Sequence, residues 1–168
     1  MTDQRMLDVL TEITDAVAAT CGLQTSLAPP KSTTQGHAIL NSVNLNYYPR
    51  GGGVGWHADD EFLFDSLNRE TAIVSLSLFN AADSGKRRFQ VRIKRALRSN
   101  DRMASEEADA TLILGHGDLM TMEGLHQLFY LHSVWPGDSC EHQDHPLTQG
   151  ERINLTWRTI VQHMDGSE

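Results

Sequence analysis

The spacing of apolar residues divides the chain into a helical start and a strand-rich remainder. Over residues 3–21 apolar side chains recur every three or four positions, at Met6, Leu10, Ile13 and Val17. This period predicts an amphipathic helix with one buried face, capped by Thr2 or Asp3 and ended by Gly22. From Ala38 onward the period changes to two, which is the alternation of a β-strand.

The remainder of the chain has the pattern of short strands joined by turns rich in Gly, Pro and Asn. The alternating or apolar segments cover residues 42–48, 71–79, 88–94, 111–114, 119–122, 128–134 and 152–161. A further strand follows the glycine-rich turn at residues 49–55. The segment 71–79 carries little charge, so we expect it to be buried on both faces. One helix and about eight strands predict a mainly β fold with an N-terminal helix (α+β), built as a barrel or double-sheet jelly roll.

The composition is that of one soluble domain over residues 1–168, with a helix and loop region at 1–37 and a strand core at 38–162. No apolar run is long enough to cross a membrane, and no cationic apolar leader precedes the helix. Cys21 and Cys140 are too few for a disulfide framework. These features predict a soluble intracellular monomer, in the cytoplasm or the nucleus.

Charge is unevenly distributed along the chain. The formal net charge of −8 argues against broad electrostatic attachment to nucleic acid. Eight of the 14 Lys and Arg residues nevertheless lie between Lys86 and Arg102. This basic stripe could hold a phosphate backbone locally, or it could be the solvated edge strand of a sheet.

The pattern His-x-Asp, which could bind a metal, occurs three times, starting at His57, His116 and His142. Only the first match ends a predicted strand and leaves a long stretch in which a distal histidine can follow. The second lies in a tight turn between glycines, where the turn alone explains the Asp, and the third lies in a loop. A His and a carboxylate two residues apart on a strand project from the same face, so His57 and Asp59 could supply two ligands of a divalent metal.

The third ligand should be a histidine on a downstream strand. His132 lies in the segment 128–134, whereas its main competitor, His126, follows a predicted turn at 123–125. Two histidines and one carboxylate would form the facial triad of non-haem Fe(II) oxygenases. A histidine on a strand is more often structural, so the assignment depends on the last strand of the chain.

The last strand has an apolar face and a polar face, the latter formed by Arg152, Asn154, Thr156 and Arg158. If the polar face lines the interior, two guanidinium groups are buried and require anions as partners. A dicarboxylate cosubstrate would supply one anion to each arginine. The alternative is an edge strand whose polar face meets solvent.

Four motifs, in this order, resemble the AlkB family of Fe(II)- and 2-oxoglutarate-dependent dioxygenases: Asn46-x-Tyr48, His57-x-Asp59, His132 and Arg152-x-Asn154-x-Thr156-x-Arg158. The resemblance implies a double-stranded β-helix, a cupin-like jelly roll, and an enzyme that uses Fe(II), 2-oxoglutarate and oxygen. The implied iron ligands and catalytic residues are His57, Asp59 and His132. The implied 2-oxoglutarate site comprises Asn46, Tyr48, Arg152, Asn154, Thr156 and Arg158, with Arg152 on the distal carboxylate.

The AlkB family typically hydroxylates N-methyl groups on nucleobases, which then release formaldehyde. The resemblance therefore implies oxidative demethylation of DNA or RNA. Asp60 and Glu61 occupy the place from which relatives contact a flipped base, and carboxylates there favour a cationic methylated base. We also expect substrate contacts from Trp56, Arg87 and Arg88. Residues 22–37 can form only an abbreviated lid, which favours a single-stranded substrate.

Three alternatives stay open. The same cofactor chemistry could act on a protein side chain or a small molecule, which the acidic composition and the short lid would suit. The chain could instead be a non-catalytic jelly-roll module that binds a metal or ligand. Cys140, His142 and His145 could bind zinc in a loop, although their spacing matches no common zinc motif and no fourth ligand is evident.

Overall fold

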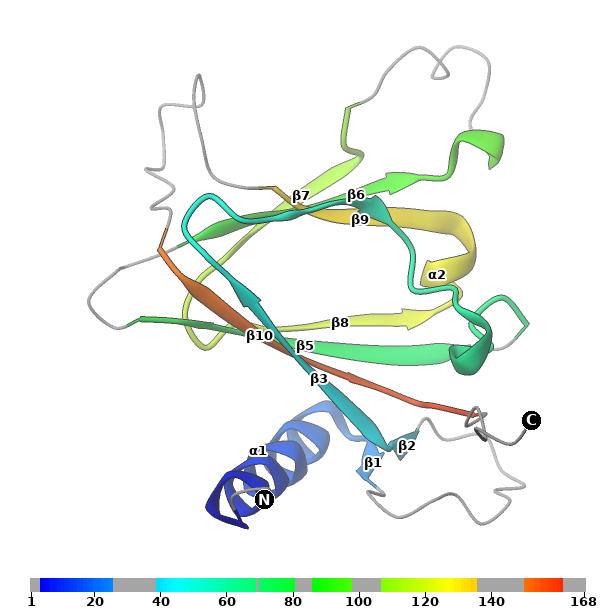
Figure 1. Cartoon of the computed structure of the whole chain (residues 1–168). Helices are drawn as coiled ribbons and strands as arrows, with labels where there is room; N and C mark the ends of the chain where they lie inside the picture. The colour runs from blue at the N-terminus through cyan, green and yellow to red at the C-terminus, as the bar shows by residue number, and fades with distance from the viewer. Residues whose placement is uncertain are drawn as a thin grey trace, which may run out of the picture.

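Two four-stranded antiparallel sheets face each other in the computed structural model, and one helix lies against the outer face of the first sheet (Figure 1). The structure describes residues 4–25, 39–68, 70–80, 86–97, 107–135 and 150–161. This arrangement is a double-stranded β-helix. The prediction of a mainly β jelly roll with an N-terminal helix is therefore confirmed.

The first or major sheet contains β3 (Ser42–Tyr48), β5 (Thr71–Phe79), β8 (Leu119–Gly124) and β10 (Arg152–Arg158). The second or minor sheet contains β4 (Val54–His57), β6 (Arg87–Ile93), β7 (Ala110–Leu114) and β9 (Tyr130–Trp135). A short parallel pair joins β1 (Gln24–Thr25) and β2 (Ile39–Leu40). The helices are α1 (Gln4–Cys21) and α2 (His126–Phe129), and the 3-10 turns are η1 (Phe62–Phe64) and η2 (Arg95–Leu97).

The strand order alternates between distant parts of the sequence. The major sheet has the order β3-β10-β5-β8 and the minor sheet the order β4-β9-β6-β7. The C-terminal strand β10 thus lies between β3 and β5, antiparallel to both. Because β10 is hydrogen-bonded along both edges, the edge-strand alternative is excluded. Most of its residues are also buried.

Helix α1 covers part of the outer face of the major sheet. Val17 and Ala18 pack with outer-face residues of the sheet that include Val74, Leu155 and Trp157. Leu10 and Ile13 pack against the same cluster, but Met6 is 49% exposed, so the predicted buried face begins only at Leu10. Gly22 ends the helix as predicted, with φ of 66°.

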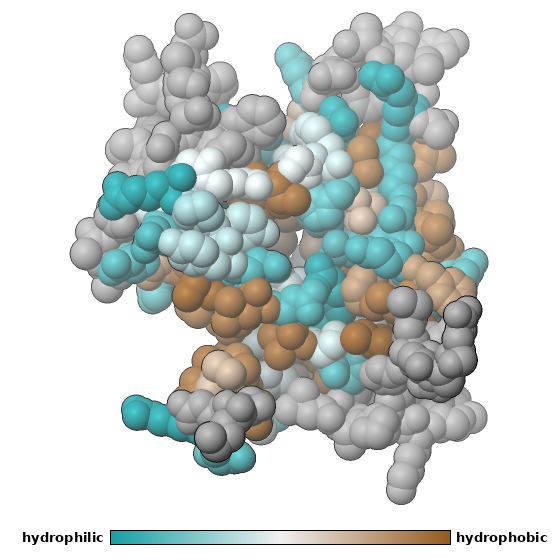
Figure 2. Space-filling view, in the orientation of Figure 1, coloured by the Kyte–Doolittle hydropathy of each residue, from teal (hydrophilic) through white to brown (hydrophobic). Residues whose placement is uncertain are grey.

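The space between the sheets has an apolar part and a polar part. Ile73, Phe89, Leu114, Met122 and Val134 form a second buried cluster there. Strand β5 contributes Val74 to the outer cluster and Ile73 to the inner one, so the prediction that it is buried on both faces is confirmed. Figure 2 shows polar side chains gathered in the middle of this face of the molecule, where the space between the sheets opens.

Strand β9 begins later than predicted, because a helical turn precedes it. Gly124 has a φ of 65° and ends β8, and the N–H groups of Leu128 and Phe129 both donate to the carbonyl of Leu125. The predicted segment 128–134 therefore starts in α2. No helix in the described part of the chain is long and apolar enough to cross a membrane.

Several predicted features lie outside the described residues. They are the helix caps Thr2 and Asp3, most of the abbreviated lid, the cations Arg98 and Arg102 of the basic stripe, and the cluster Cys140, His142 and His145.

Candidate metal and cosubstrate site

The three residues predicted to bind iron meet at one end of the space between the sheets. His57 ends β4 and pairs in register with His132 of β9, and the two ring centroids lie 4.2 Å apart. The Nε2 atom of His57 lies 3.8 Å from Oδ1 of Asp59. One ligand atom from each of these residues lies within 4.8 Å of the other two. The structure thus brings together His57, Asp59 and His132.

Asp59 lies beyond the end of β4, and not on the strand as predicted. Its position is set by tertiary contacts: its N–H donates to Oε1 of Gln127 at 2.9 Å, and its carbonyl accepts from the Ser66 hydroxyl at 2.7 Å. Arg158 donates through Nε and Nη2 to Oδ2 of Asp59, at 3.1 and 2.8 Å. This pairing leaves Oδ1 directed toward His57. The sequence held no signal for the roles of Gln127 and Ser66.

The surroundings of both histidines suit metal binding. Nδ1 of His57 lies 2.8 Å from the carbonyl of Gly55, and a carbonyl can only accept, so Nδ1 carries a proton and Nε2 is the nitrogen left to bind a metal. Burial is the main reason why the pKa of His132 falls to about 4. A neutral imidazole is the ligand form. Two imidazoles and one carboxylate are a donor set that fits Fe(II).

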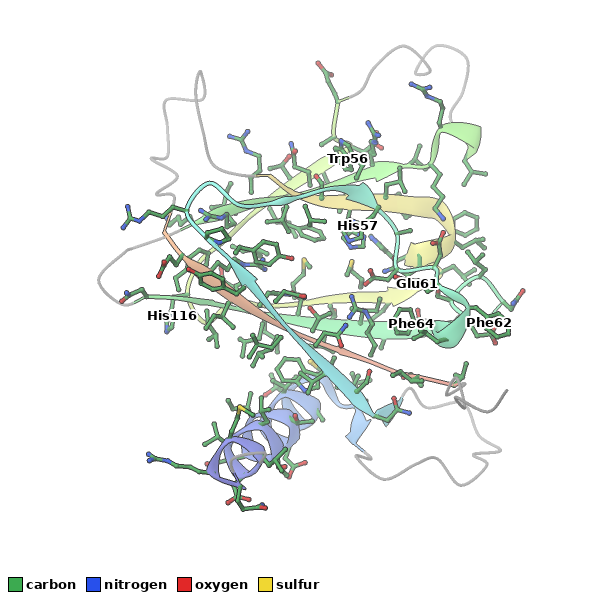
Figure 3. The ribbon with its side chains drawn as sticks, viewed as in Figure 1. Trp56, His57, Glu61, Phe62, Phe64 and His116 are labelled. Carbon is green, nitrogen blue, oxygen red and sulfur yellow. The ribbon has the colours of Figure 1, made fainter. Side chains whose placement is uncertain are left out.

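The other histidines near the predicted motifs have different roles. The His126 ring stacks on Tyr130, with centroids 5.2 Å apart, and lies 6.1 Å from the His132 ring. His126 is therefore a neighbour of the triad and does not belong to it. His116 lies at the opposite end of the barrel from His57 (Figure 3), where its Nδ1 accepts from the N–H of Phe79.

The polar face of β10 lines the interior. Arg152, Asn154 and Thr156 are 1%, 6% and 5% exposed. Arg152 donates to the Ser77 hydroxyl at 3.0 Å and to Oδ1 of Asn154 at 2.6 Å. Asn154 in turn donates to Thr156, and Ser75 donates to Asn154. Neutral groups thus orient the Arg152 guanidinium without neutralising its charge.

Both arginines of β10 have hydrogen-bonding capacity left for an anion. Within the described residues, Nη1 of Arg152 and Nη1 of Arg158 are buried and have no hydrogen-bond partner. The Arg152 guanidinium also lies over the Tyr48 ring, 5.2 Å from its centroid. Burial is the main reason why the pKa of Arg152 falls to about 10. A buried cation with an unused donor fits the carboxylate of a bound ligand.

One cavity joins the triad to these arginines. It is lined by every residue predicted to bind iron or 2-oxoglutarate: Asn46, Tyr48, His57, Asp59, His132, Arg152, Asn154, Thr156 and Arg158. Apolar walls complete it, and they include Val54, Phe89, Met120, Met122 and Val134. The predicted binding residues, which come from four strands and one loop, therefore share a single space, with two imidazoles at one end and Arg152 at the other.

The residues predicted to contact a substrate are spread over different surfaces. Asp60 and Glu61 are exposed next to Asp59, and Lys94 pairs with Asp60 at 3.1 Å. Trp56 lies on the outer face of the minor sheet, opposite to His57 (Figure 3), because neighbouring strand positions point to opposite faces. There its ring stacks with the guanidinium of Arg92, 4.3 Å from the centroid.

The predicted basic stripe is divided by the alternation of β6. Arg88 alternates with the inward-facing Phe89, so it lies on the outer face with Arg92. Arg87 instead shares the inner face of β6 with Phe89 and is 0% exposed. Including Arg87 in an exposed stripe was therefore wrong, and neither Arg87 nor Trp56 is placed where a substrate could reach it at the mouth of the cavity.

Comparisons with known proteins agree with this geometry. The family model of the 2OG-Fe(II) oxygenase superfamily matches residues 2–158. The chain is 30% identical over 129 residues to the DNA oxidative demethylase ALKBH2 of Arabidopsis thaliana, a match that covers 73% of this chain and 38% of that protein. It is 37% identical over 126 residues to alpha-ketoglutarate-dependent dioxygenase alkB homolog 3 of Bos taurus, covering 74% of this chain and 38% of that protein.

Among solved structures, OsALKBH1 is similar in fold, with a TM-score of 0.52 and 23% sequence identity over 93% of this chain and 64% of that one. The chain spans less than half the length of the two curated relatives. The superfamily uses Fe(II) and 2-oxoglutarate, which the donor set and the buried arginines fit. The match over nearly the whole chain, together with the triad and the polar strand β10, shows that this protein belongs to the 2OG-Fe(II) oxygenase superfamily as an AlkB-like member.

Proposed function

We propose that this protein is a Fe(II)- and 2-oxoglutarate-dependent dioxygenase that oxidatively demethylates N-methylated nucleobases in single-stranded DNA or RNA. The observation that carries the proposal is the single cavity that joins the His57, Asp59 and His132 cluster to the unused donor of Arg152. A metal and a dicarboxylate can be held together in such a cavity, and the mouth beside Asp59 remains for a substrate.

His57, Asp59 and His132 would hold the iron, which together with 2-oxoglutarate and oxygen supplies the oxidising chemistry. Arg158 donates to Oδ2 of Asp59, so Oδ1 is the oxygen that would be left to bind a metal. The Gly55 carbonyl fixes the orientation of the His57 ring in the same way. These contacts hold the ligands in position before the metal arrives, which reduces the reorganisation that binding requires.

Arg152 would bind the distal carboxylate of 2-oxoglutarate through Nη1, assisted by Tyr48, Asn46 and Asn154 on the same inner face. Ser77 and Asn154 hold the guanidinium so that little side-chain entropy is lost when the carboxylate binds. Arg158 would contact the carboxylate nearer the metal, while Thr156 accepts a hydrogen bond from Asn154 and so supports it. Apolar side chains such as Met122 and Val134 limit the access of water.

A nucleobase substrate is supported by the relatives and by the mouth of the cavity. One relative is named a DNA oxidative demethylase. Asp60 and Glu61 place two carboxylates beside the iron site, which favours a base that methylation has made cationic. Phe62, which is 77% exposed and follows Glu61, offers an aromatic surface on which a neighbouring base can stack (Figure 3).

The net charge of −8 favours a single-stranded substrate over a duplex, because flipping a base from a duplex requires a stronger grip on the backbone. Arg88 and Arg92 on the outer face of the minor sheet could contribute local phosphate contacts. We propose that the protein acts as a monomer.

The proposal is tested by measuring succinate and formaldehyde with Fe(II), 2-oxoglutarate and methylated single-stranded oligonucleotides. The panel should contain the cationic bases 1-methyladenine and 3-methylcytosine and the neutral base N6-methyladenine, each in DNA and RNA. We expect matched succinate and formaldehyde with a cationic base, and loss of both in His132→Ala. His116→Ala is the matched control, because His116 belongs to a His-x-Asp motif outside the site.

The outcomes separate the alternatives. Succinate release that no oligonucleotide stimulates would support the dioxygenase assignment but indicate a different substrate, such as a protein side chain or a small molecule. Binding of metal and 2-oxoglutarate without any succinate would identify a non-catalytic binding module. Equal activity on neutral and cationic bases would remove the role of Asp60 and Glu61 in selecting charge.

A further inference from the structure

Arg87 is a completely buried cation to which the proposed function gives no role. It is 0% exposed, and desolvation lowers its pKa. Moving a guanidinium out of water has a large desolvation free energy, and a neutral polar side chain at this position would have a smaller one. The position of this charge in the barrel is therefore informative.

The register of β6 places Arg87 deep in the barrel. Val91 pairs with the metal ligand His132, and Arg87 lies on the same inner face of β6, four residues earlier. At the rise of a β-strand this is about 13 Å farther from the iron site. In the major sheet, Arg152 likewise lies at the end of β10 that is remote from Arg158 and Asp59. The two buried guanidiniums therefore occupy the same deep end, on opposite sheets.

Arg87 connects the sheets at this end. Its Nη2 donates to the carbonyl of Gly150 at 2.5 Å, two residues before Arg152. Its guanidinium also lies 5.9 Å from the ring centroid of Phe79, the residue that pairs with Arg152 in β5. Both contacts are made to neighbours of the Arg152 backbone, since Gly150 lies two residues before Arg152 and Phe79 pairs with it across the sheet. Arg87 therefore helps to hold the beginning of β10, from which Arg152 projects.

The charge of Arg87 also acts on Arg152. It contributes, after burial, to the lowered pKa of Arg152. Arg152 contacts neutral groups, namely Ser77, Asn154 and the Tyr48 ring. A second cation behind an incompletely neutralised one raises the positive potential of the deep end, and the attraction for an anion there increases.

We propose that Arg87 is a positioning and selectivity residue for the cosubstrate, which holds Arg152 in place and makes the deep end of the cavity specific for 2-oxo acids that end in a carboxylate. This inference rests on the proposed binding of 2-oxoglutarate. Arg87 acts through Arg152 and through the electrostatic potential, and does not itself need to touch the ligand.

The test measures binding, with Mn(II) in place of Fe(II) so that no turnover occurs. Dissociation constants are determined by calorimetry for 2-oxoglutarate and for 2-oxopentanoate, which has the same five-carbon chain but no distal carboxylate. We expect Arg87→Met to weaken the binding of 2-oxoglutarate about tenfold and to change the binding of 2-oxopentanoate less than about twofold. The reason is that a displaced Arg152 would lose much of its charge-assisted contact with the distal carboxylate, and one such contact is worth roughly a factor of ten or more. Arg87→Lys should keep most of the selectivity, because it keeps the charge.

The control is Lys86→Met, which removes one positive charge from the exposed neighbour of Arg87 and should leave both dissociation constants unchanged. If Arg87→Met weakened the binding of both acids equally, the role of Arg87 would be merely structural. If it changed neither dissociation constant, Arg87 would have no role in binding. Either result overturns the inference. If Arg87→Met does not fold, the dissociation constants of 2-oxoglutarate and 2-oxopentanoate are compared in Arg87→Lys and Arg87→Gln instead. A selectivity kept in Arg87→Lys and lost in Arg87→Gln would support the inference, and equal selectivity in the two variants would overturn it. Failure of the unaltered protein to bind 2-oxoglutarate would instead contradict the proposed function itself.

Discussion

Hydrogen bonds from neighbouring residues decide which atoms of His57 and Asp59 remain available to bind a metal. The carbonyl of Gly55 accepts a hydrogen bond from Nδ1–H of His57, and Arg158 donates to Oδ2 of Asp59. The atoms left over, Nε2 and Oδ1, lie 3.8 Å apart and face the site where a metal would bind. The same residue types without these neighbours would present a mixture of tautomers and carboxylate orientations.

Burial of His132 predicts an acid-sensitive metal-free protein. The folded pKa of about 4 lies below the ordinary value of 6.5. Between these two values the unfolded chain binds more protons than the folded chain, so the free energy of unfolding falls as the pH falls from about 6.5 toward about 4. For His132 this loss amounts to about 2 kcal/mol between pH 7 and pH 5.

Urea unfolding of the metal-free protein at pH 7 and pH 5 measures this contribution. His132→Asn, which cannot titrate in this range, should lose about 2 kcal/mol less than the unaltered protein over the same interval. An identical loss in both proteins would assign the acid sensitivity to other groups.

Lys94 predicts a second effect at the residue scale, on substrate binding. Its Nζ lies 3.1 Å from Oδ2 of Asp60, and its N–H is fixed by the carbonyl of Phe129. Lys94→Met should leave the Asp60 carboxylate unanchored and raise KM for a methylated oligonucleotide a few-fold, while KM for 2-oxoglutarate stays constant. The effect on stability should be below about 1 kcal/mol, because the pair is partly exposed.

Steady-state kinetics with each substrate varied in turn test the role of Lys94. Lys94→Arg should restore the oligonucleotide KM, because it restores the ion pair. A parallel rise of KM for 2-oxoglutarate would mean that Lys94 acts on the whole site and not on Asp60.

At the scale of elements, β10 supports the site because one of its faces lines the cavity and the other packs against α1. Arg152, Asn154 and Thr156 face the cavity, whereas Leu155 and Trp157 pack outward in the cluster beneath α1. Trp157 is 0% exposed, and its Nε1 donates to the Thr14 hydroxyl of α1 at 2.8 Å. The helix therefore secures the strand that carries both arginines.

Thr14→Val is expected to lower the free energy of unfolding by about 1–3 kcal/mol, because it keeps the shape of the side chain and leaves the buried Trp157 N–H without a partner. Thr14→Ser, which retains the hydroxyl, should lose less. Urea denaturation followed by tryptophan fluorescence measures both variants. Equal losses in the two variants would show that packing and not the hydrogen bond holds the helix.

For the whole molecule, the two sheets contribute different parts of the site. The minor sheet supplies both histidines, and the major sheet supplies Arg152 and Asn154. Metal alone should therefore stabilise mainly the minor-sheet side, and 2-oxoglutarate should add contacts that span both sheets. Each ligand at a hundred times its dissociation constant contributes about 2.7 kcal/mol.

Thermal unfolding with Mn(II), and then with Mn(II) and 2-oxoglutarate, tests this expectation. Each addition should raise Tm by roughly 5–10 °C for a chain of this size. Arg152→Met should keep the increase caused by Mn(II) and lose the increase caused by 2-oxoglutarate. Loss of both increases would indicate that the variant disrupts the fold and not only the cosubstrate site.

Much of the fold could be predicted because a strand's alternation is local. The change of period after α1, the apolar segment 71–79 and the two faces of β10 are all visible without knowledge of the partners. The spacing of Met6 also fitted the helix, but spacing cannot show where the sheet beneath the helix ends. The helical turn of α2 was missed because four residues are too few for a helical period.

The sequence by itself determined the strand pattern, the order of the ligand motifs and the polar face of the last strand, because each depends on residues a few positions apart. Tertiary structure decided that His132 and not His126 meets His57, that Asp59 reaches the site from beyond its strand, and that Arg87 is buried while Arg88 is not. Those outcomes depend on how β9 pairs with β4 and β6, which are distant in the sequence. Register across such distances is a property of the folded sheet, and shifting it by one residue would exchange the inner and outer faces.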